Sequence, residues 1–356
     1  MKPYFKAFTL LSITALVGLL FFASCGGDEE LVEGATFKTP GDLQIQYGKV
    51  LPLKINVPDG LKKVELYYND SLVKTFPGKK GEQSFNLIAY YYGVGAWNAI
   101  LRSYFADGTQ QDESLNIRVT SDITPTDYKI AIVNTYPHNK ENYTQGLEFS
   151  NGQLYEGTGD PGQQGKTLLA KVDLNSGAIG TKIGLDNPNY FGEGITILGD
   201  KIYQLTWKNG ECFIYDKNTL QLDKKSFRYT GQGWGLCNNG KQLIMSDGTE
   251  RIYFRDPKTF GIIRTIEVYD NIGPITELNE LEYIDGKIWA NVYMTNRVVV
   301  IDPNTGMVLE EIDCTELEIQ GKNGGDVLNG IAHNNGKIYM TGKYWDKLFE
   351  VKKVPF

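Results

Sequence analysis

A single glutamate, Glu193, lies between two glycines, and the first glycine follows two aromatic residues, Tyr190 and Phe191. A carboxylate in an apolar setting suits general acid and base catalysis, because burial raises its pKa toward neutral pH. A glycine-flanked glutamate is also common in turns, so the local pattern alone assigns no role. The pattern becomes informative because it recurs along the second half of the chain.

Five segments of similar pattern begin 41 to 50 residues apart. Each is followed six or seven residues later by a tight-turn residue, which is typical of a β-hairpin. Several units also close with a similar outer turn, such as Asp256-Pro-Lys-Thr259. A repeat of this length with about four strands per unit is typical of β-propeller blades. The segments begin at Gln145, Glu193, Trp234, Asn279 and Asn329.

Corresponding positions of the five units meet at one end of a propeller channel, so these side chains should form a ring. The return strand of each hairpin regains that end, and we expect a second ring there, made of Gly159, Trp207, Asp247, Tyr293 and Lys343. Channel walls of small propellers favour small or apolar residues. Two rings of mostly polar and aromatic side chains therefore predict a functional site.

Two residues near these rings leave alternatives open, and a third is expected to have a structural role. Asp247 and Asn329 fit the site and a rim or hairpin turn about equally well, and both are kept as candidates. Glu280 should point away from Asn279, because successive side chains of a strand face opposite sides.

The sequence as a whole predicts an all-β protein, with a five-bladed β-propeller preceded by a small immunoglobulin-like β-sandwich. Residues 36–120 contain short alternating strands separated by turn signals and form the predicted sandwich, which we expect to act as a spacer. Residues 121–128 are predicted to form a linker, and residues 129–356 are predicted to form the propeller. The last unit has three recognisable strands, so the lone strand at 129–135 should supply the fourth and close the ring.

The N-terminus has the pattern of a bacterial export signal. Residues 1–24 combine two lysines with an apolar run, and Ala23-Ser24-Cys25 resembles a lipobox whose cysteine is lipidated. Residues 25–35 would then be a tether. We expect an exported bacterial lipoprotein anchored in the outer membrane, facing the periplasm or the surface. An ordinary signal peptide with an incidental cysteine is the alternative.

Composition limits the other partners. Acidic residues outnumber basic ones, 43 to 36, without a basic cluster, so nucleic acid is not expected and the membrane is contacted through the lipid alone. The spacing of the two histidines suggests no zinc site, and no cofactor is expected to be required. A structural metal ion held by backbone carbonyls in the channel stays open. We expect a monomer whose remaining cysteines, Cys212, Cys237 and Cys314, are buried thiols.

Motifs from nearly every unit together resemble the plant and bacterial type of glutaminyl-peptide cyclotransferase, from about Tyr128 to the C-terminus. They include Tyr143-Thr-Gln-Gly-Leu-Glu-Phe149, Phe191-Gly-Glu-Gly194, Gly233-Trp-Gly235, Leu278-Asn-Glu-Leu-Glu282 and Leu328-Asn-Gly-Ile-Ala332. The resemblance implies a five-bladed propeller that converts the N-terminal glutamine of peptides or proteins to pyroglutamate with loss of ammonia.

The resemblance also implies the roles of individual residues. It gives the acid/base role to Glu193 and places Tyr143, Gln145, Phe191, Trp207, Trp234, Asn279 and Lys343 in the substrate pocket. Tyr143 and Tyr293 stand where the plant enzymes carry phenylalanine and tryptophan, respectively. Both differences keep an aromatic wall, so the resemblance predicts the activity more firmly than the substrate preference.

The reaction requires the substrate's α-amine to attack its own side-chain amide, with one carboxylate carrying a proton from the amine to the leaving NH₂. Negative charge on the amide oxygen needs donors, and Gln145, Asn279, Lys343 and the Trp207 indole N–H are the candidates. Two other functions remain open. A glycoside hydrolase would use opposed carboxylates such as Glu193 and Asp247, and a non-catalytic propeller would bind peptides or glycans at its aromatic mouth.

Overall fold

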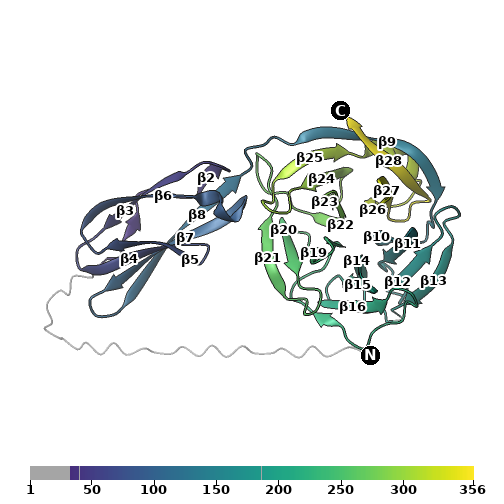
Figure 1. The fold of residues 1–356 in the computed structure, drawn as a ribbon, viewed down its shortest axis with the longest axis horizontal. Coiled ribbons are helices and arrows are strands. Elements are labelled where there is room, and N and C mark those ends of the chain that lie inside the picture. Colours follow the sequence, from purple (N-terminus) through teal and green to yellow (C-terminus); the bar gives the residue numbers. More distant parts are fainter. Residues whose placement is uncertain (1–32, 40, 186) are drawn as a thin grey trace, which may run out of the picture. The chain divides into compact units, whose positions relative to one another are not determined.

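Strands dominate the computed structural model, which describes residues 33–39, 41–185 and 187–356 (Figure 1). By their contacts, Gly34–Phe356 form one compact unit, so the predicted boundary between sandwich and propeller stays a prediction. The predicted signal segment, Cys25 and most of the tether lie outside the described residues. Within the described part of the chain, no helix has the length and apolar character needed to span a bilayer.

Two sheets make up the N-terminal part and enclose one hydrophobic cluster that includes Leu66, Leu101 and Ile117. One has the strand order β1-β3-β6 and the other β2-β8-β7-β4-β5. Alternating buried and exposed side chains along β3 show why these residues form strands with one face on a core. The strands are β1 (Thr36–Phe37), β2 (Leu43–Gln46), β3 (Leu51–Val57), β4 (Leu61–Tyr68), β5 (Ser71–Pro77), β6 (Gly81–Leu87), β7 (Gly95–Phe105) and β8 (Gln110–Thr120), with a 3₁₀ turn at Ala89–Tyr92.

The remaining strands form sheets arranged around one axis, as in a β-propeller (Figure 1). Three sheets have four strands each, in chain order from the axis outward. They are β10 (Thr144–Ser150), β11 (Gln153–Thr158), β12 (Leu168–Val172) and β13 (Ile179–Gly184); β14 (Gly192–Leu198), β15 (Lys201–Thr206), β16 (Glu211–Asp216) and β17 (Phe227–Arg228); and β18 (Leu236–Asn238), β19 (Leu243–Ser246), β20 (Arg251–Arg255) and β21 (Ile262–Glu267).

The last sheet has eight strands because one strand joins two groups of strands. The first group is β22 (Leu278–Ile284), β23 (Lys287–Val292), β24 (Arg297–Ile301) and β25 (Val308–Asp313), and the second is β26 (Leu328–Asn334), β27 (Lys337–Gly342) and β28 (Lys347–Pro355), with helix α1 (Thr315–Gly321) between them. The joining strand is β9 (Thr126–Pro137), which pairs with β25 in parallel and with β28 antiparallel.

This pairing confirms that the strand before the first repeat supplies the missing strand of the last one. The strand begins at Thr126, inside the predicted linker, because its first residues pair with β25. The inner strands β10, β14, β18, β22 and β26 contact one another in succession, and β26 contacts β10. The chain ends therefore close the ring, and the inner strands line its axis.

Glycines let these inner strands approach closely. Four of the strands carry glycine one residue after the predicted ring position, and a Cβ on Gly235 would lie only 1.9 Å from the Asn279 carbonyl oxygen. The fifth, β22, carries Glu280, whose carboxylate accepts hydrogen bonds from the backbone N–H of Leu147 (3.3 Å) and Ile331 (2.9 Å). Glu280 therefore links β22 to β10 and β26, which confirms that it points away from the predicted site.

The three predicted cysteine thiols, Cys212, Cys237 and Cys314, are buried and free. Among the residues that the structure describes, no group of three His, Cys, Asp or Glu side chains is placed to hold a metal ion. A channel metal held by backbone carbonyls stays untested.

Candidate active site

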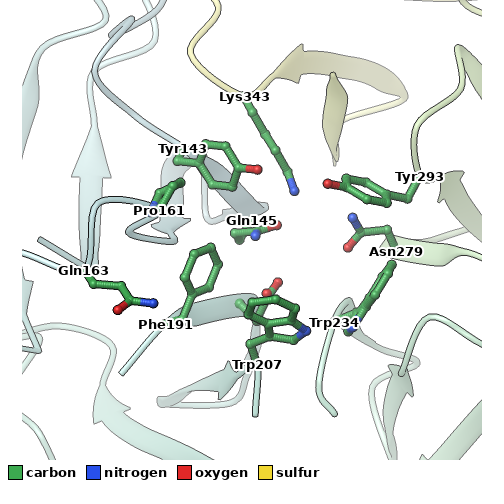
Figure 2. A pocket seen from close by; sticks show the side chains of 11 residues that line it. Tyr143, Gln145, Pro161, Gln163, Phe191, Trp207, Trp234, Asn279, Tyr293 and Lys343 are labelled. Atoms are coloured by element: carbon green, nitrogen blue, oxygen red, sulfur yellow. The ribbon is translucent and has the colours of Figure 1, made fainter. Parts of the chain in front are cut away.

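A cavity of about 290 Å³ opens where the predicted rings meet (Figure 2). Nine of the eleven predicted site residues line it, together with two residues that the repeat did not predict, Pro161 and Gln163. The nine are Tyr143, Gln145, Phe191, Glu193, Trp207, Trp234, Asn279, Tyr293 and Lys343.

Irregular strand pairing aims the polar side chains at this cavity. The pairing of β14 with β15 shifts between Gly192 and Ile195, on either side of Glu193. Equivalent shifts flank Gln145 in β10, Asn279 in β22 and Asn329 in β26. Such bulges turn a side chain out of the regular alternation of a strand, and they recur at functional sites. Three of these bulges present a residue that lines the cavity, and the fourth carries Asn329, which does not line it.

Five aromatic side chains surround the cavity, and we call them the aromatic wall. Three neighbouring pairs meet at steep angles, with ring centres 5.5 to 6.0 Å apart. Lys343 Nζ lies between two tyrosines of the wall, 4.7 Å from the ring centre of Tyr143 and 4.8 Å from that of Tyr293. The faces of two aromatic rings favour a cation at this position. The wall consists of Tyr143, Phe191, Trp207, Trp234 and Tyr293.

Glu193 is 4 % exposed, and its side-chain carboxylate has no hydrogen-bond partner among the described residues. Burial raises the pKa of its carboxyl well above the usual range, and the charge of Lys343 opposes this shift. Burial lowers the pKa of Lys343 to about 8, against the charges of Glu193 and Asp326. An acid and a base thus share one cavity with pKa values displaced toward each other, which suits proton transfer at neutral pH.

The two tryptophan N–H groups share one acceptor in this structure. The Trp207 Nε1 donates to Gln232 Oε1 at 2.5 Å, and the Trp234 Nε1 donates to the same oxygen at 3.1 Å. The role of the Trp207 indole N–H as an oxyanion donor stays a prediction, because in this structure its one donor bonds Gln232.

Two predicted residues are not part of the cavity wall. The Asp247 carboxylate accepts hydrogen bonds from the Thr249 backbone and hydroxyl and from the Tyr253 hydroxyl, so it stabilises a turn. Asn329 is buried beneath the cavity, where its Nδ2 donates to the Thr144 carbonyl (3.0 Å) and to Gln145 Oε1 (3.2 Å). Asn329 thus orients Gln145.

Sequence reasoning missed Pro161 and Gln163 because they lie in the connection from β11 to β12, which is longer than the equivalent connection of every other unit. Gly159, a member of the second predicted ring, makes room for the wall, since a Cβ there would lie 2.3 Å from the Phe191 ring. Among the residues that line the cavity, Glu193 is the one carboxylate. The opposed acid that a glycoside hydrolase needs is not among them.

Comparisons with known proteins agree with this geometry. A family model described as glutamine cyclotransferase matches residues 104–353. The glutaminyl-peptide cyclotransferase of Arabidopsis thaliana is 38 % identical over 231 residues, which cover 63 % of this chain and 71 % of that protein. The crystal structure of the Myxococcus xanthus glutaminyl cyclase is 36 % identical, covers 64 % of this chain and 98 % of its own, and superimposes with a TM-score of 0.60. The chain belongs to the glutamine cyclotransferase family.

Proposed function

We propose that this protein is a glutaminyl-peptide cyclotransferase in which Glu193 is the catalytic acid and base. It converts the N-terminal glutamine of peptides and proteins to pyroglutamate and releases ammonia, the activity that its family membership supports. The observation that carries the role of Glu193 is its position as a buried carboxylate, without a hydrogen-bond partner among the described residues, in the wall of the cavity.

The proton transfers follow from the chemistry of the substrate. The α-amine of a peptide has a pKa of about 8 and arrives largely as an ammonium. The Glu193 carboxylate takes one proton from it, and the neutral amine attacks the side-chain amide carbon to close a five-membered ring. Glu193 then gives the proton to the amide nitrogen, and the carbon–nitrogen bond breaks. The ring nitrogen loses its second proton to Glu193, which passes it to the departing ammonia, so that ammonium is released and the carboxylate is restored. The raised pKa of Glu193 suits the second transfer without preventing the first.

Negative charge develops on the former amide oxygen, and three side chains of the cavity carry suitable donors. Lys343 offers an ammonium, and Gln145 and Asn279 offer amide N–H groups. The Asn279 Oδ1 is buried without a partner among the described residues, so it can accept a hydrogen bond from the substrate amine or amide. The reaction balances without a cofactor, since Glu193 and the substrate carry every proton.

Replacement of Glu193 by glutamine tests the proposal. A coupled ammonia assay with a Gln-initiated dipeptide should show at least about a hundredfold loss of kcat, in the range typical for removing a general acid and base. Glu277→Gln is the matched control, because Glu277 is exposed and does not line the cavity. Retention of more than a tenth of the wild-type turnover by Glu193→Gln would remove the assigned role.

The same assay separates the other two functions. Release of reducing sugar from glycan substrates without ammonia would support a glycoside hydrolase, and saturable peptide binding without either product would support a binding protein. The lone carboxylate of the cavity wall favours cyclisation over glycoside hydrolysis.

We further propose five blades, because five inner strands surround the axis, and an immunoglobulin-like domain ahead of them. The protein is a monomer, which light scattering would test. Export and lipid anchoring at Cys25 rest on the sequence of residues 1–25. Recovery of a Cys25→Ala variant in the membrane fraction, like the wild type, would contradict the anchor.

A further inference from the structure

The aromatic wall is interrupted between Trp207, which follows β15, and Trp234, which precedes β18 in the next sheet. No aromatic contact joins these two rings within the described part of the chain. Gln232 spans the interruption, since its Oε1 accepts the hydrogen bonds of both indole N–H groups. A carbonyl oxygen has two lone pairs, so one acceptor can satisfy both donors. Gln232 itself is exposed and does not line the cavity.

The backbone around Gln232 is fixed against the neighbouring sheet. The Tyr229 hydroxyl donates to the Thr206 carbonyl at 2.5 Å and accepts from the Thr206 N–H at 3.2 Å. The Gly233 N–H donates to the Trp207 carbonyl at 3.0 Å. Glycine is needed at this point because a Cβ on Gly233 would lie 2.3 Å from the Tyr229 hydroxyl oxygen. The backbone segment that carries Gln232 is therefore hydrogen-bonded to Trp207, and the Trp207 indole N–H in turn donates to the Gln232 side chain.

The two indoles have different supports on their other sides. Trp207 contacts Phe191, with ring centres 5.6 Å apart, and Trp234 contacts Tyr293 at 5.5 Å. Gly248 also backs Trp234, since a Cβ there would lie 2.7 Å from its ring. Lys208 Nζ also lies 3.8 Å from the ring centre of Trp207. Each indole thus packs against an aromatic neighbour, and Gln232 accepts its N–H on the side that faces the other indole. Both N–H groups are therefore occupied in this structure.

We propose that Gln232 is a positioning residue for the cyclisation reaction, which holds the indoles of Trp207 and Trp234 together and closes the aromatic wall around the substrate's glutamine side chain. The inference rests on the proposed function of the cavity. Gln232 acts through the two tryptophans and touches neither Glu193 nor Lys343, so it affects how tightly the substrate is held more than how fast it reacts.

Replacing Gln232 by alanine should raise KM for a Gln-initiated dipeptide about tenfold, because two side chains must then be ordered on binding. The change in kcat should stay within about threefold, since the acid and base are untouched. Gln232→Glu keeps an oxygen that can accept both N–H groups and should restore KM to within about threefold of the wild type. Gln221→Ala, an exposed glutamine of the propeller surface away from the cavity, is the matched control.

Binding measured without turnover separates this inference from the role of Glu193. Tryptophan fluorescence should follow dipeptide binding to the Glu193→Gln protein, and the added Gln232→Ala change should weaken it about tenfold. If Glu193→Gln stays active, the acid/base role fails and the KM comparison still tests Gln232. An unchanged KM and binding constant in Gln232→Ala, or an equal loss in Gln232→Glu, would overturn the inference. Thermal unfolding within about 2 °C of the wild type, less than the shift that 1 kcal/mol causes, excludes a folding defect.

Discussion

Replacing Asp326 by asparagine should move the alkaline limb of the kcat/KM profile to lower pH. Lys343 is 2 % exposed, and burial lowers its pKa to about 8 while Glu193 and Asp326 oppose the shift. An opposite charge close by displaces a pKa by about one to three units, and the partly exposed position of Asp326 favours the lower end. Without this charge, Lys343 should lose its proton about one pH unit earlier.

Tyr143→Phe provides a matched control for the charge. The Tyr143 hydroxyl donates to Asp326 Oδ2 at 3.3 Å, and an asparagine there keeps an oxygen that can accept this bond. Asp326→Asn thus removes the charge and keeps the contact, whereas Tyr143→Phe removes the contact and keeps the charge. We expect the alkaline limb to move in the first variant and to stay in place in the second.

The assay compares each variant with the wild type on one dipeptide, because the α-amine of the substrate titrates in the same region and cancels in the ratio. With Lys343 pKa values of about 8 and about 7, the ratio of wild-type to variant kcat/KM should rise from about one at pH 6 to about tenfold at pH 9. A ratio that is independent of pH would refute the reasoning that Asp326 keeps Lys343 protonated.

Two further variants test carboxylates outside the cavity, the partly exposed Glu148 and the buried Glu156. Burial raises the pKa of Glu148 to about 8, so the stability linked to its proton is complete below about pH 4.5 and is lost as pH rises through about 8. Glu148→Gln should reduce the fall of the urea midpoint between pH 6 and pH 9, and an equally steep fall would contradict this. The Glu156 carboxylate lies 3.1 Å from His138 Nε2; burial opposes both charges, but their mutual attraction lowers the pKa of Glu156 and raises that of His138. The stability that the pair contributes should therefore fall as pH drops through the lowered pKa of Glu156 or rises through the raised pKa of His138. Glu156→Gln should lower the free energy of unfolding by about 3 to 5 kcal/mol at neutral pH. A loss below about 1 kcal/mol in urea unfolding would contradict this.

The repeat in the sequence located the inner strands because the hairpins carry their own local signals, a glycine near the start of four of them and a turn residue after each. Counting strands also predicted that the segment around residue 129 would complete the last sheet, as β9 does. The start of that strand at Thr126 was not predictable, since its first residues are fixed by parallel pairing with β25, almost two hundred residues away. Pairing at such a distance leaves no local pattern.

The same difference between residues with and without a sequence signal applies to the candidate site. Residues at repeated positions were predicted, whereas Pro161, Gln163 and Gln232 were not, because their connecting segments do not recur. The placement of Asp247 had a local signal that the repeat argument overrode. Asp-Gly-Thr at 247–249 is turn chemistry, in which the carboxylate accepts from the backbone two residues later.

Burial alone does not make a carboxylate catalytic, and Glu193 and Glu280 show the difference. Both lie in inner strands of the ring, both are nearly inaccessible to solvent, and burial raises the pKa of both carboxyls well above the usual range. Glu280 accepts two backbone N–H groups and does not line the cavity, so its proton has no substrate to reach. Glu193 faces the cavity, has no hydrogen-bond partner among the described residues and shares the space with the Lys343 ammonium, so its interactions are left for the substrate to complete.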